Sequence, residues 1–216
     1  MEFVSRFVSW LFLPLCAPVF ALAAAMYLES YQQGIFQDQT IFHLQPQYKD
    51  FLIYLFTALS IVFPCLAILF FRLNGRISNL LMDNRRERII PSIFVNGSGI
   101  LLYVLLVRID PNHVLPNAIY GLSMGSLITV AICTIITFKW KISLHAAGMG
   151  IMTGFAFAYF STQVSYEFWI IPAIVTASGL VMSARMFLKA HTLSQLMSGY
   201  LLGTAVLFLT VFLYTK

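Results

Sequence analysis

Charged side chains are scarce in this chain. Only 10% of its 216 residues are Asp, Glu, Lys or Arg, whereas 60% are hydrophobic. A soluble domain carries about 25% charged residues, so this composition excludes a water-soluble protein. The mean hydropathy of +0.85 instead predicts an all-α bundle of transmembrane helices, forming a single integral membrane domain over residues 1–216.

Cysteine and acidic residues are also few. Cys16, Cys65 and Cys133 lie in apolar stretches, without the spacing of a zinc site or a disulfide framework. The eight acidic residues form no D-x-x-x-D pair, which excludes the magnesium-binding motif of a membrane prenyltransferase. No carboxylate cluster accompanies the histidines, so we expect no metal and no other cofactor. The net charge of +5 lies in short loops, which indicates membrane topology and not nucleic-acid binding.

Long apolar stretches are abundant. A helix needs about 20 apolar residues to cross a bilayer, and this criterion predicts about seven spans. They cover residues 7–28, 51–72, 92–107, 117–138, 145–161, 168–187 and 192–214. The first span has an alternative interpretation as a cleaved signal peptide, because Arg6 precedes it and residues 21–24 resemble a cleavage site. Cleavage would leave six spans, but the length of the stretch favours a retained anchor.

Proline and glycine recur inside the predicted spans. We expect prolines to bend their helices, at Pro14, Pro18, Pro64 and Pro172. Glycines four residues apart allow two membrane helices to approach closely. Such pairs are Gly121/Gly125, Gly150/Gly154 and Gly199/Gly203. Packing within the bundle is the favoured interpretation, although the pairs also permit a homo-oligomer.

The basic residues of the loops predict an orientation. One membrane face receives Arg6, Arg72, Arg76, Arg85, Arg86, Arg88, Lys139, Lys141, Arg185 and Lys189. The other face receives Lys49, Arg108 and Lys216. Because basic loops remain in the cytoplasm, we expect the first face and the N-terminus to be cytoplasmic. A bacterial inner membrane is the expected location.

Three loops on the basic face carry residues suited to phosphate chemistry. In chain order these residues are Arg85, Arg86, Arg88, Ser143, His145, Arg185, His191 and Gln195. Guanidinium groups bind phosphate oxygens in a bidentate manner, and a helix start favours an anion. Two imidazoles beside several arginines indicate phosphoryl transfer, with one histidine as the nucleophile and the other as the general acid.

These residues follow an ordered pattern along the chain. Residues 183–195 read SARMFLKAHTLSQ, with five residues between Arg185 and His191. Residues 142–145 read ISLH, and residues 83–91 read DNRRERIIP. The pattern resembles the three motifs of the type 2 phosphatidic acid phosphatase superfamily, K-x6-R-P, P-S-G-H and S-R-x5-H-x3-D. The resemblance covers a phosphatase-like core of about residues 76–214.

The resemblance implies a metal-independent membrane hydrolase that acts through a phosphohistidine. By this resemblance His191 would attack phosphorus, and His145 would protonate the leaving alkoxide. Arg185, Ser143 and some of the arginines at 85, 86 and 88 would hold the phosphate. The implied substrate is a lipid phosphate or a polyprenyl diphosphate, taken directly from the membrane lipids.

The chain also departs from the family motifs. Ile90 replaces the first-motif arginine, Leu144 replaces the second-motif glycine, and Gln195 replaces the third-motif aspartate. Gln195 is four residues after His191, so their side chains can meet on one helix face. Its neutral amide lacks the charge that stabilises an imidazolium. In serine proteases the comparable loss of charge lowers turnover by about 10⁴.

Alternative functions follow from these departures. An inactive relative would keep the bundle and bind lipid head groups or act as a scaffold. The arginines at 85, 86 and 88 would then be only topology determinants near anionic lipid, and Ser143 would be only a helix cap. A small transporter is the third hypothesis. It ranks last because the span centres carry almost no charge and the chain contains no inverted repeat.

Overall fold

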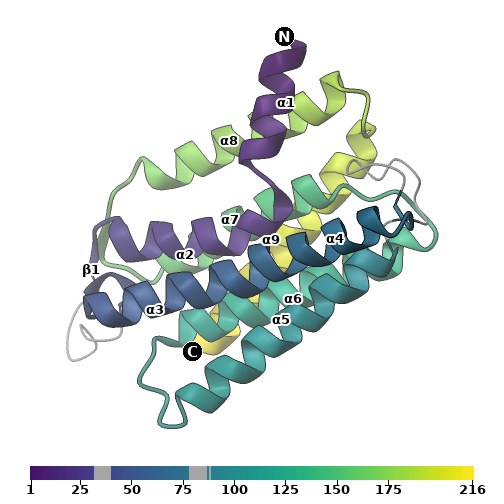
Figure 1. Ribbon diagram of the computed structural model, residues 1–216. Helices are drawn as coiled ribbons and strands as arrows, with labels where there is room; N and C mark the ends of the chain where they lie inside the picture. Colours follow the sequence, from purple (N-terminus) through teal and green to yellow (C-terminus); the bar gives the residue numbers. More distant parts are fainter. Residues whose placement is uncertain (32–39, 78–86, 88) are drawn as a thin grey trace.

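The computed structural model describes residues 1–31, 40–77, 87 and 89–216 (Figure 1). It is an all-α bundle, as the sequence predicts. The long helices are α1 (Glu2–Leu11), α2 (Ala17–Tyr27), α3 (Pro46–Thr57), α4 (Phe63–Leu73), α5 (Ile89–Ile109), α6 (Asn117–Thr137), α7 (Leu144–Phe160), α8 (Ile170–Phe187) and α9 (Leu193–Thr215). Short segments join them: η1 (Pro14–Cys16), β1 (Ser30–Tyr31), η3 (Ile41–His43), η4 (Ala58–Val62) and β2 (Ser165–Tyr166).

Six helical stretches are long and apolar enough to cross a membrane. They are Glu2–Tyr27, Pro46–Leu73, Ile89–Ile109, Asn117–Thr137, Ile170–Phe187 and Leu193–Thr215. A helix satisfies its backbone hydrogen bonds internally, which is the requirement for a segment surrounded by lipid. Large apolar side chains such as Phe94, Leu180 and Leu213 are exposed on the outside of the bundle. The architecture is that of a multi-pass integral membrane protein.

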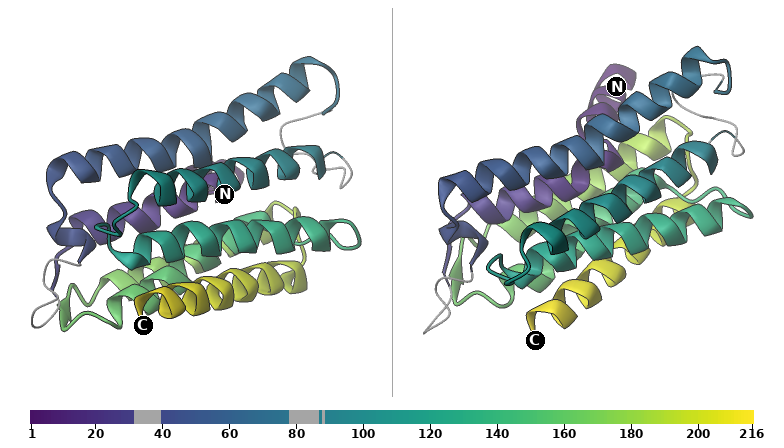
Figure 2. Two further views of the ribbon diagram at one scale, coloured as in Figure 1. Left: turned by 90° about the horizontal axis from the view of Figure 1, so that it is seen from below. Right: turned by 60° about the horizontal axis from the view of Figure 1, so that its bottom comes forward.

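Helix α7 occupies the centre of the bundle. It has 17 residues, and most of its side chains are buried. Helices α9, α8, α2 and α6 pack around it. Figure 2 shows α6 between α5 and α9, with the helices lying side by side along their lengths. Because neighbouring protein surrounds α7, its burial does not depend on its spanning the full bilayer.

The predicted glycine pairs mediate packing inside the chain. A Cβ atom added to Gly150 would lie 2.3 Å from the Tyr200 carbonyl oxygen, and one added to Gly203 would lie 2.3 Å from the Ala147 carbonyl oxygen. A Cβ atom on Gly121 would lie 2.9 Å from the backbone of Val211. Helices α6 and α7 therefore approach α9 at distances that only glycine allows. The interpretation of these pairs as bundle packing is confirmed.

The first predicted span is not one continuous helix, which corrects the prediction over 7–28. Helix α1 ends at Leu11, and the chain resumes as a 3₁₀ turn at Pro14. Figure 1 shows α1 projecting away from the line of α2. Proline lacks an N–H donor and clashes with the preceding turn, so a helix is expected to stop before Pro14.

The other prolines act differently from one another. Pro64 follows η4, a π-helical stretch within the long α3–α4 span, which is a recognised way for a helix to accommodate an irregularity. Pro172 is the third residue of α8. The prediction of a bend there was wrong, because first-turn residues do not need an intrahelical donor.

The end of the bundle where α5 meets α6 is held by polar contacts. The Asp110 carboxylate accepts hydrogen bonds from the backbone N–H groups of Val114 and Leu115 at 2.9 and 2.7 Å, and from the Tyr120 hydroxyl at 2.6 Å. At the same end β1 pairs antiparallel with β2. The Tyr159 hydroxyl accepts a hydrogen bond from the Ile41 N–H at 3.1 Å.

Candidate functional site

Ser143 and His145 lie where α7 begins. The Ser143 side chain is fully buried and caps the helix by accepting a hydrogen bond from the Ala146 N–H at 3.4 Å. Its interpretation as a helix cap is therefore confirmed. His145 is half-buried, and its Nε2 lies 3.2 Å from the carbonyl oxygen of Ser9 in α1. A carbonyl can only accept, so this ring nitrogen is a donor.

The five residues between Arg185 and His191 form a tight helix-to-helix turn. The Ala190 N–H donates to the Arg185 carbonyl at 3.1 Å, and the Lys189 N–H donates to the Met186 carbonyl at 2.9 Å. These are the two bonds of a Schellman motif, with Lys189 in the left-handed conformation at φ 52°. The turn keeps Arg185, at the end of α8, close in the chain to the start of α9. The Arg185 side chain is only 8% exposed.

The start of α9 fixes the orientation of the His191 ring. Gln195 and Thr192 form a capping box, in which the Gln195 Oε1 accepts from the Thr192 N–H at 3.2 Å. This backbone donor identifies the Gln195 atom as oxygen and not nitrogen. The same oxygen lies 3.1 Å from Nδ1 of His191. Since that oxygen cannot donate, Nδ1 carries a proton, and in the neutral form of this ring the lone pair lies on Nε2.

The structure joins the starts of α7 and α9. The Ser143 N–H donates to the Gln195 carbonyl at 3.3 Å. A Cβ atom on Gly199 would lie 2.5 Å from the Ser143 carbonyl oxygen, so the two backbones are in direct contact. Residues of the second and third motifs, about 50 positions apart in the chain, therefore share one end of the bundle. His191 is 7% exposed, so this is a largely buried site.

Of residues 83–91, the structure describes only residues 87 and 89–91. Arg85, Arg86 and Arg88 lie outside the described residues, so their predicted role stays a prediction. Glu87 is described, and it lines a cavity of about 190 Å³ together with Arg76, Phe71, Ile77 and Ile90. Among the described residues, no group of three or more His, Cys, Asp or Glu side chains is placed to hold a metal ion.

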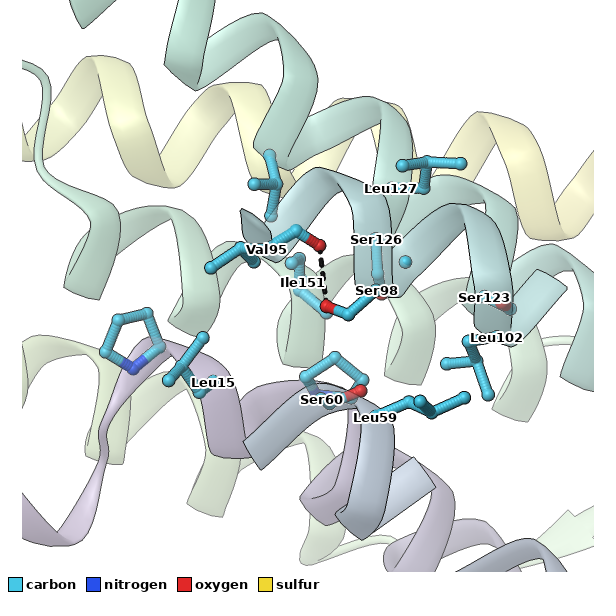
Figure 3. A pocket seen from close by; sticks show the side chains of 14 residues that line it. Leu15, Leu59, Ser60, Val95, Ser98, Leu102, Ser123, Ser126, Leu127 and Ile151 are labelled. Carbon is cyan, nitrogen blue, oxygen red and sulfur yellow. Dashed lines mark hydrogen bonds between the residues drawn. The ribbon is translucent and has the colours of Figure 1, made fainter. Parts of the chain in front are cut away.

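Cavities in the bundle lie beside the candidate site. One, of about 60 Å³, runs along α7 between Leu144 and Ile151 and also contacts Pro14 and Cys133. A second, of about 50 Å³, continues from Ile151 toward Leu102 (Figure 3). Its lining is apolar apart from serines on three elements, Ser60, Ser98, Ser123 and Ser126.

Sequence reasoning missed these serines. Figure 3 shows Ser98 and Ser126 close together, with Ser98 bonded to the Val95 carbonyl at 2.9 Å. Within the described part of the chain, the buried hydroxyls of Ser123 and Ser126 have no hydrogen-bond partner. Their spacing of three residues places them on the same side of α6. Serines that repeat at this spacing within an apolar span were the available signal.

Comparisons with known proteins give no relative for this chain. No family model, no curated protein and no solved structure matches it.

Proposed function

We propose that this chain is a membrane lipid-phosphate phosphatase-like protein that acts through a phosphohistidine. The observation that carries the proposal is the orientation of His191. Its Nδ1 proton points at the Gln195 oxygen, so Nε2 keeps the lone pair that a nucleophile needs. The start of α7 is joined to the same turn of α9, because the Ser143 N–H donates to the Gln195 carbonyl, and the start of a helix favours an anion.

The proposed reaction has two steps. In the first, Nε2 of His191 forms a bond to phosphorus while the bond from phosphorus to the lipid oxygen breaks. The His145 imidazolium, whose Nε2 proton is bonded to the Ser9 carbonyl, transfers its Nδ1 proton to the leaving oxygen. In the second, His145 removes a proton from water, and the water oxygen forms a bond to phosphorus. The bond from phosphorus to Nε2 breaks, its electron pair returns to His191, and inorganic phosphate leaves. Arg185 and the arginines at 85, 86 and 88 balance the charge of the phosphate oxygens, and the Ser143 hydroxyl donates a hydrogen bond to one of them.

The substrate class follows from the surroundings of the site. The cavities beside α7 are lined mostly by apolar side chains, and the outside of the bundle carries exposed apolar side chains, which together favour a substrate that resides in the lipid. We propose a phosphatidic acid, a phosphatidylglycerol phosphate or a polyprenyl diphosphate. The excess of basic loop residues at this end favours a site facing the cytoplasm, in a bacterial inner membrane.

A second candidate function is an inactive relative that binds lipid head groups. One observation favours it. Gln195 is neutral, and its oxygen is shared between the helix cap and His191. An imidazolium formed at His191 would thus be stabilised by a dipole and not by a charge.

Phosphate release separates the two functions. The protein would be purified in detergent without added metal and given phosphatidic acid and a polyprenyl diphosphate. We expect release that is lost in His191→Ala and kept in His43→Ala, a control histidine that contacts Thr40 at the other end of the bundle. A substrate with a radioactive phosphate should transfer that phosphate to the protein, and the label should be lost in acid, as expected for a phosphohistidine. A folded protein that releases no phosphate from either lipid would contradict the phosphatase and support the inactive relative.

A further inference from the structure

Helix α1 presents its apolar side away from the protein. Phe3, Phe7 and Trp10 are 81%, 58% and 57% exposed, whereas Ser5 and Ser9 are 9% and 5% exposed. In a surface helix of a soluble protein, the apolar side faces the protein core. Here the small polar side chains face the protein, so the exposed apolar side requires an apolar surrounding.

We propose that α1 is an interfacial helix that rests in the surface of the bilayer and closes over the candidate site. Figure 1 shows α1 lying across α8 and projecting away from α2. The chain from Pro14 to Tyr27 rises about 20 Å as helix, which is about 10 Å less than the hydrocarbon thickness. A span of this length that starts at one face of the bilayer ends about 10 Å below the other face. Interfacial helices lie about 5–10 Å below the bilayer surface, so α1 would lie at the depth where this span ends.

The charged residues of α1 agree with this placement. Glu2 and Arg6 form an ion pair of 2.7 Å, and their side chains are 65% and 62% exposed. In a helical projection they lie between the exposed apolar side and the buried serines. A helix parallel to the bilayer surface can place these charges among the head groups while Phe7 and Trp10 enter the acyl chains.

The protein-facing side of α1 contacts a candidate catalytic residue. The Ser9 carbonyl accepts a hydrogen bond from Nε2 of His145 at 3.2 Å. This bond holds the ring with its proton on Nε2. Ser9 is thus a positioning residue, which links the seating of α1 in lipid to the orientation of the His145 ring. The consequence for catalysis rests on the proposed function, whereas the placement of α1 does not.

Spin-label accessibility tests the placement. Single cysteines at Phe3, Arg6, Phe7 and Trp10 would be labelled in the full chain, with the three native cysteines replaced by alanine, in phosphatidylcholine–phosphatidylglycerol vesicles. We expect spin labels at positions 3, 7 and 10 to collide mainly with molecular oxygen, which concentrates in lipid. The label at position 6 should collide mainly with a water-soluble nickel chelate. A smooth gradient from residue 3 to residue 10 would show a continuous span and overturn the proposal. Low contact with both reagents at every position would show a protein partner and overturn it equally.

The contact with His145 needs a second measurement that does not use phosphate release. The ¹⁵N spectrum of His145 in vesicles, assigned with His145→Asn, should show Nε2 protonated and hydrogen-bonded. The Phe7→Ser/Trp10→Ser double variant should lose this hydrogen bond, and Leu180→Ser/Phe187→Ser, which removes exposed apolar groups from α8, should keep it. The same spectrum in both variants would overturn the link between α1 and His145, whether or not the protein is a phosphatase.

Discussion

At the end of the bundle where α5 meets α6, the Asp110 carboxylate accepts three hydrogen bonds from its own loop and from Tyr120. At the end where α8 meets α9, Nδ1 of the His191 ring is hydrogen-bonded to Gln195, a residue that also caps the helix. The first arrangement uses a charged side chain to close a loop. The second uses a neutral amide oxygen to orient an imidazole ring at the start of a helix.

The two ends also differ in how they place backbone next to backbone. Both ends bring backbones into contact, but the approach is closer at the His191 end. A Cβ on Gly199 or Gly203 would lie 2.5 or 2.3 Å from a carbonyl oxygen, against 2.9 Å from the Val211 backbone for Gly121. The Asp110 end adds side-chain bonds to local N–H groups. Side-chain bonds tolerate small movements, but a backbone contact without a side chain does not. The candidate site is therefore more sensitive to added volume, and the Asp110 end is more sensitive to lost charge.

Adding one methyl group at the His191 end should have the largest effect. In Gly199→Ala the new Cβ would lie 2.5 Å from the Ser143 carbonyl oxygen, which forces α9 away from α7 and breaks the bond from Ser143 to Gln195. Overpacking of this kind costs about 3 kcal/mol. We expect a matching loss in the free energy of unfolding in detergent, together with loss of any phosphate release.

The control for this prediction is Gly179→Ala in α8. Nothing lies within 4 Å of a Cβ added there, so the substitution should be neutral or should stabilise the helix by about 0.5 kcal/mol. Equal destabilisation by both variants would contradict the special role of the α7–α9 contact.

Removing the charge at the other end should have the next largest effect. Burial alone would raise the pKa of Asp110, but the hydrogen bonds from Tyr120, Leu115 and Val114 and the proximity of His113 outweigh it and lower the pKa. Asp110→Asn places an amide donor opposite N–H groups and should cost about 2 kcal/mol.

The same residue predicts a pH dependence. A lowered pKa in the folded state gives stability that is present above the unfolded pKa of about 3.9 and is lost as the pH falls through the folded pKa. Unfolding measured from pH 6 to pH 3 should therefore show a steeper acid loss in the wild type than in Asp110→Asn. Parallel curves for the two proteins would mean that Asp110 does not titrate in this way.

Adding a negative charge beside His191 should have a smaller effect, and this effect is on turnover. Gln195→Glu keeps the length of the side chain and the capping box, and it places a carboxylate at the position 3.1 Å from Nδ1 of His191. A carboxylate stabilises the imidazolium formed during phosphoryl transfer, so turnover should rise about tenfold. The measurement is phosphate release from phosphatidic acid. Gln195→Met removes both bonds and serves as the comparison, and a higher rate in that variant would exclude the proposed role of residue 195.

The fold was largely predictable because hydropathy reports directly on the membrane spans. The glycine pairs at 150/154 and 199/203 also predicted close packing within the bundle, since close packing needs small residues at that spacing. Which helices they join, α7 and α9, is known only from the structure. The break after Leu11 was not predicted, because residues 7–28 are apolar on both sides of Pro14. Hydropathy counts apolar residues, but it does not tell which direction a helix takes after a proline.

The candidate site was predictable only in part. The spacing from His191 to Gln195 predicted their contact, which the structure confirms. The bond from His145 to Ser9 was not predictable, because it joins residues 136 positions apart and its acceptor is a backbone carbonyl that any residue supplies. The tautomer of His191 likewise depends on a backbone donor, the Thr192 N–H. Hydrogen bonds made by main-chain atoms cannot be predicted from side-chain patterns, because every residue has the same backbone carbonyl and nearly every residue has the same N–H.

The smallest expected effect concerns the turn that precedes His191. Lys189 adopts φ 52°, whereas the equivalent position at the end of α4 is Gly75 at φ 69°. A residue with a Cβ pays about 1 kcal/mol in the left-handed region, so Lys189→Gly should raise the free energy of unfolding by that amount. Gly75→Ala should lower it similarly, because Gly75 closes the same kind of turn, with the Arg76 N–H bonded to the Phe71 carbonyl at 3.0 Å. Both can be measured by urea unfolding in mild detergent. A destabilised Lys189→Gly would show that the lysine side chain stabilises the turn, and that the spacing between Arg185 and His191 depends on more than backbone geometry.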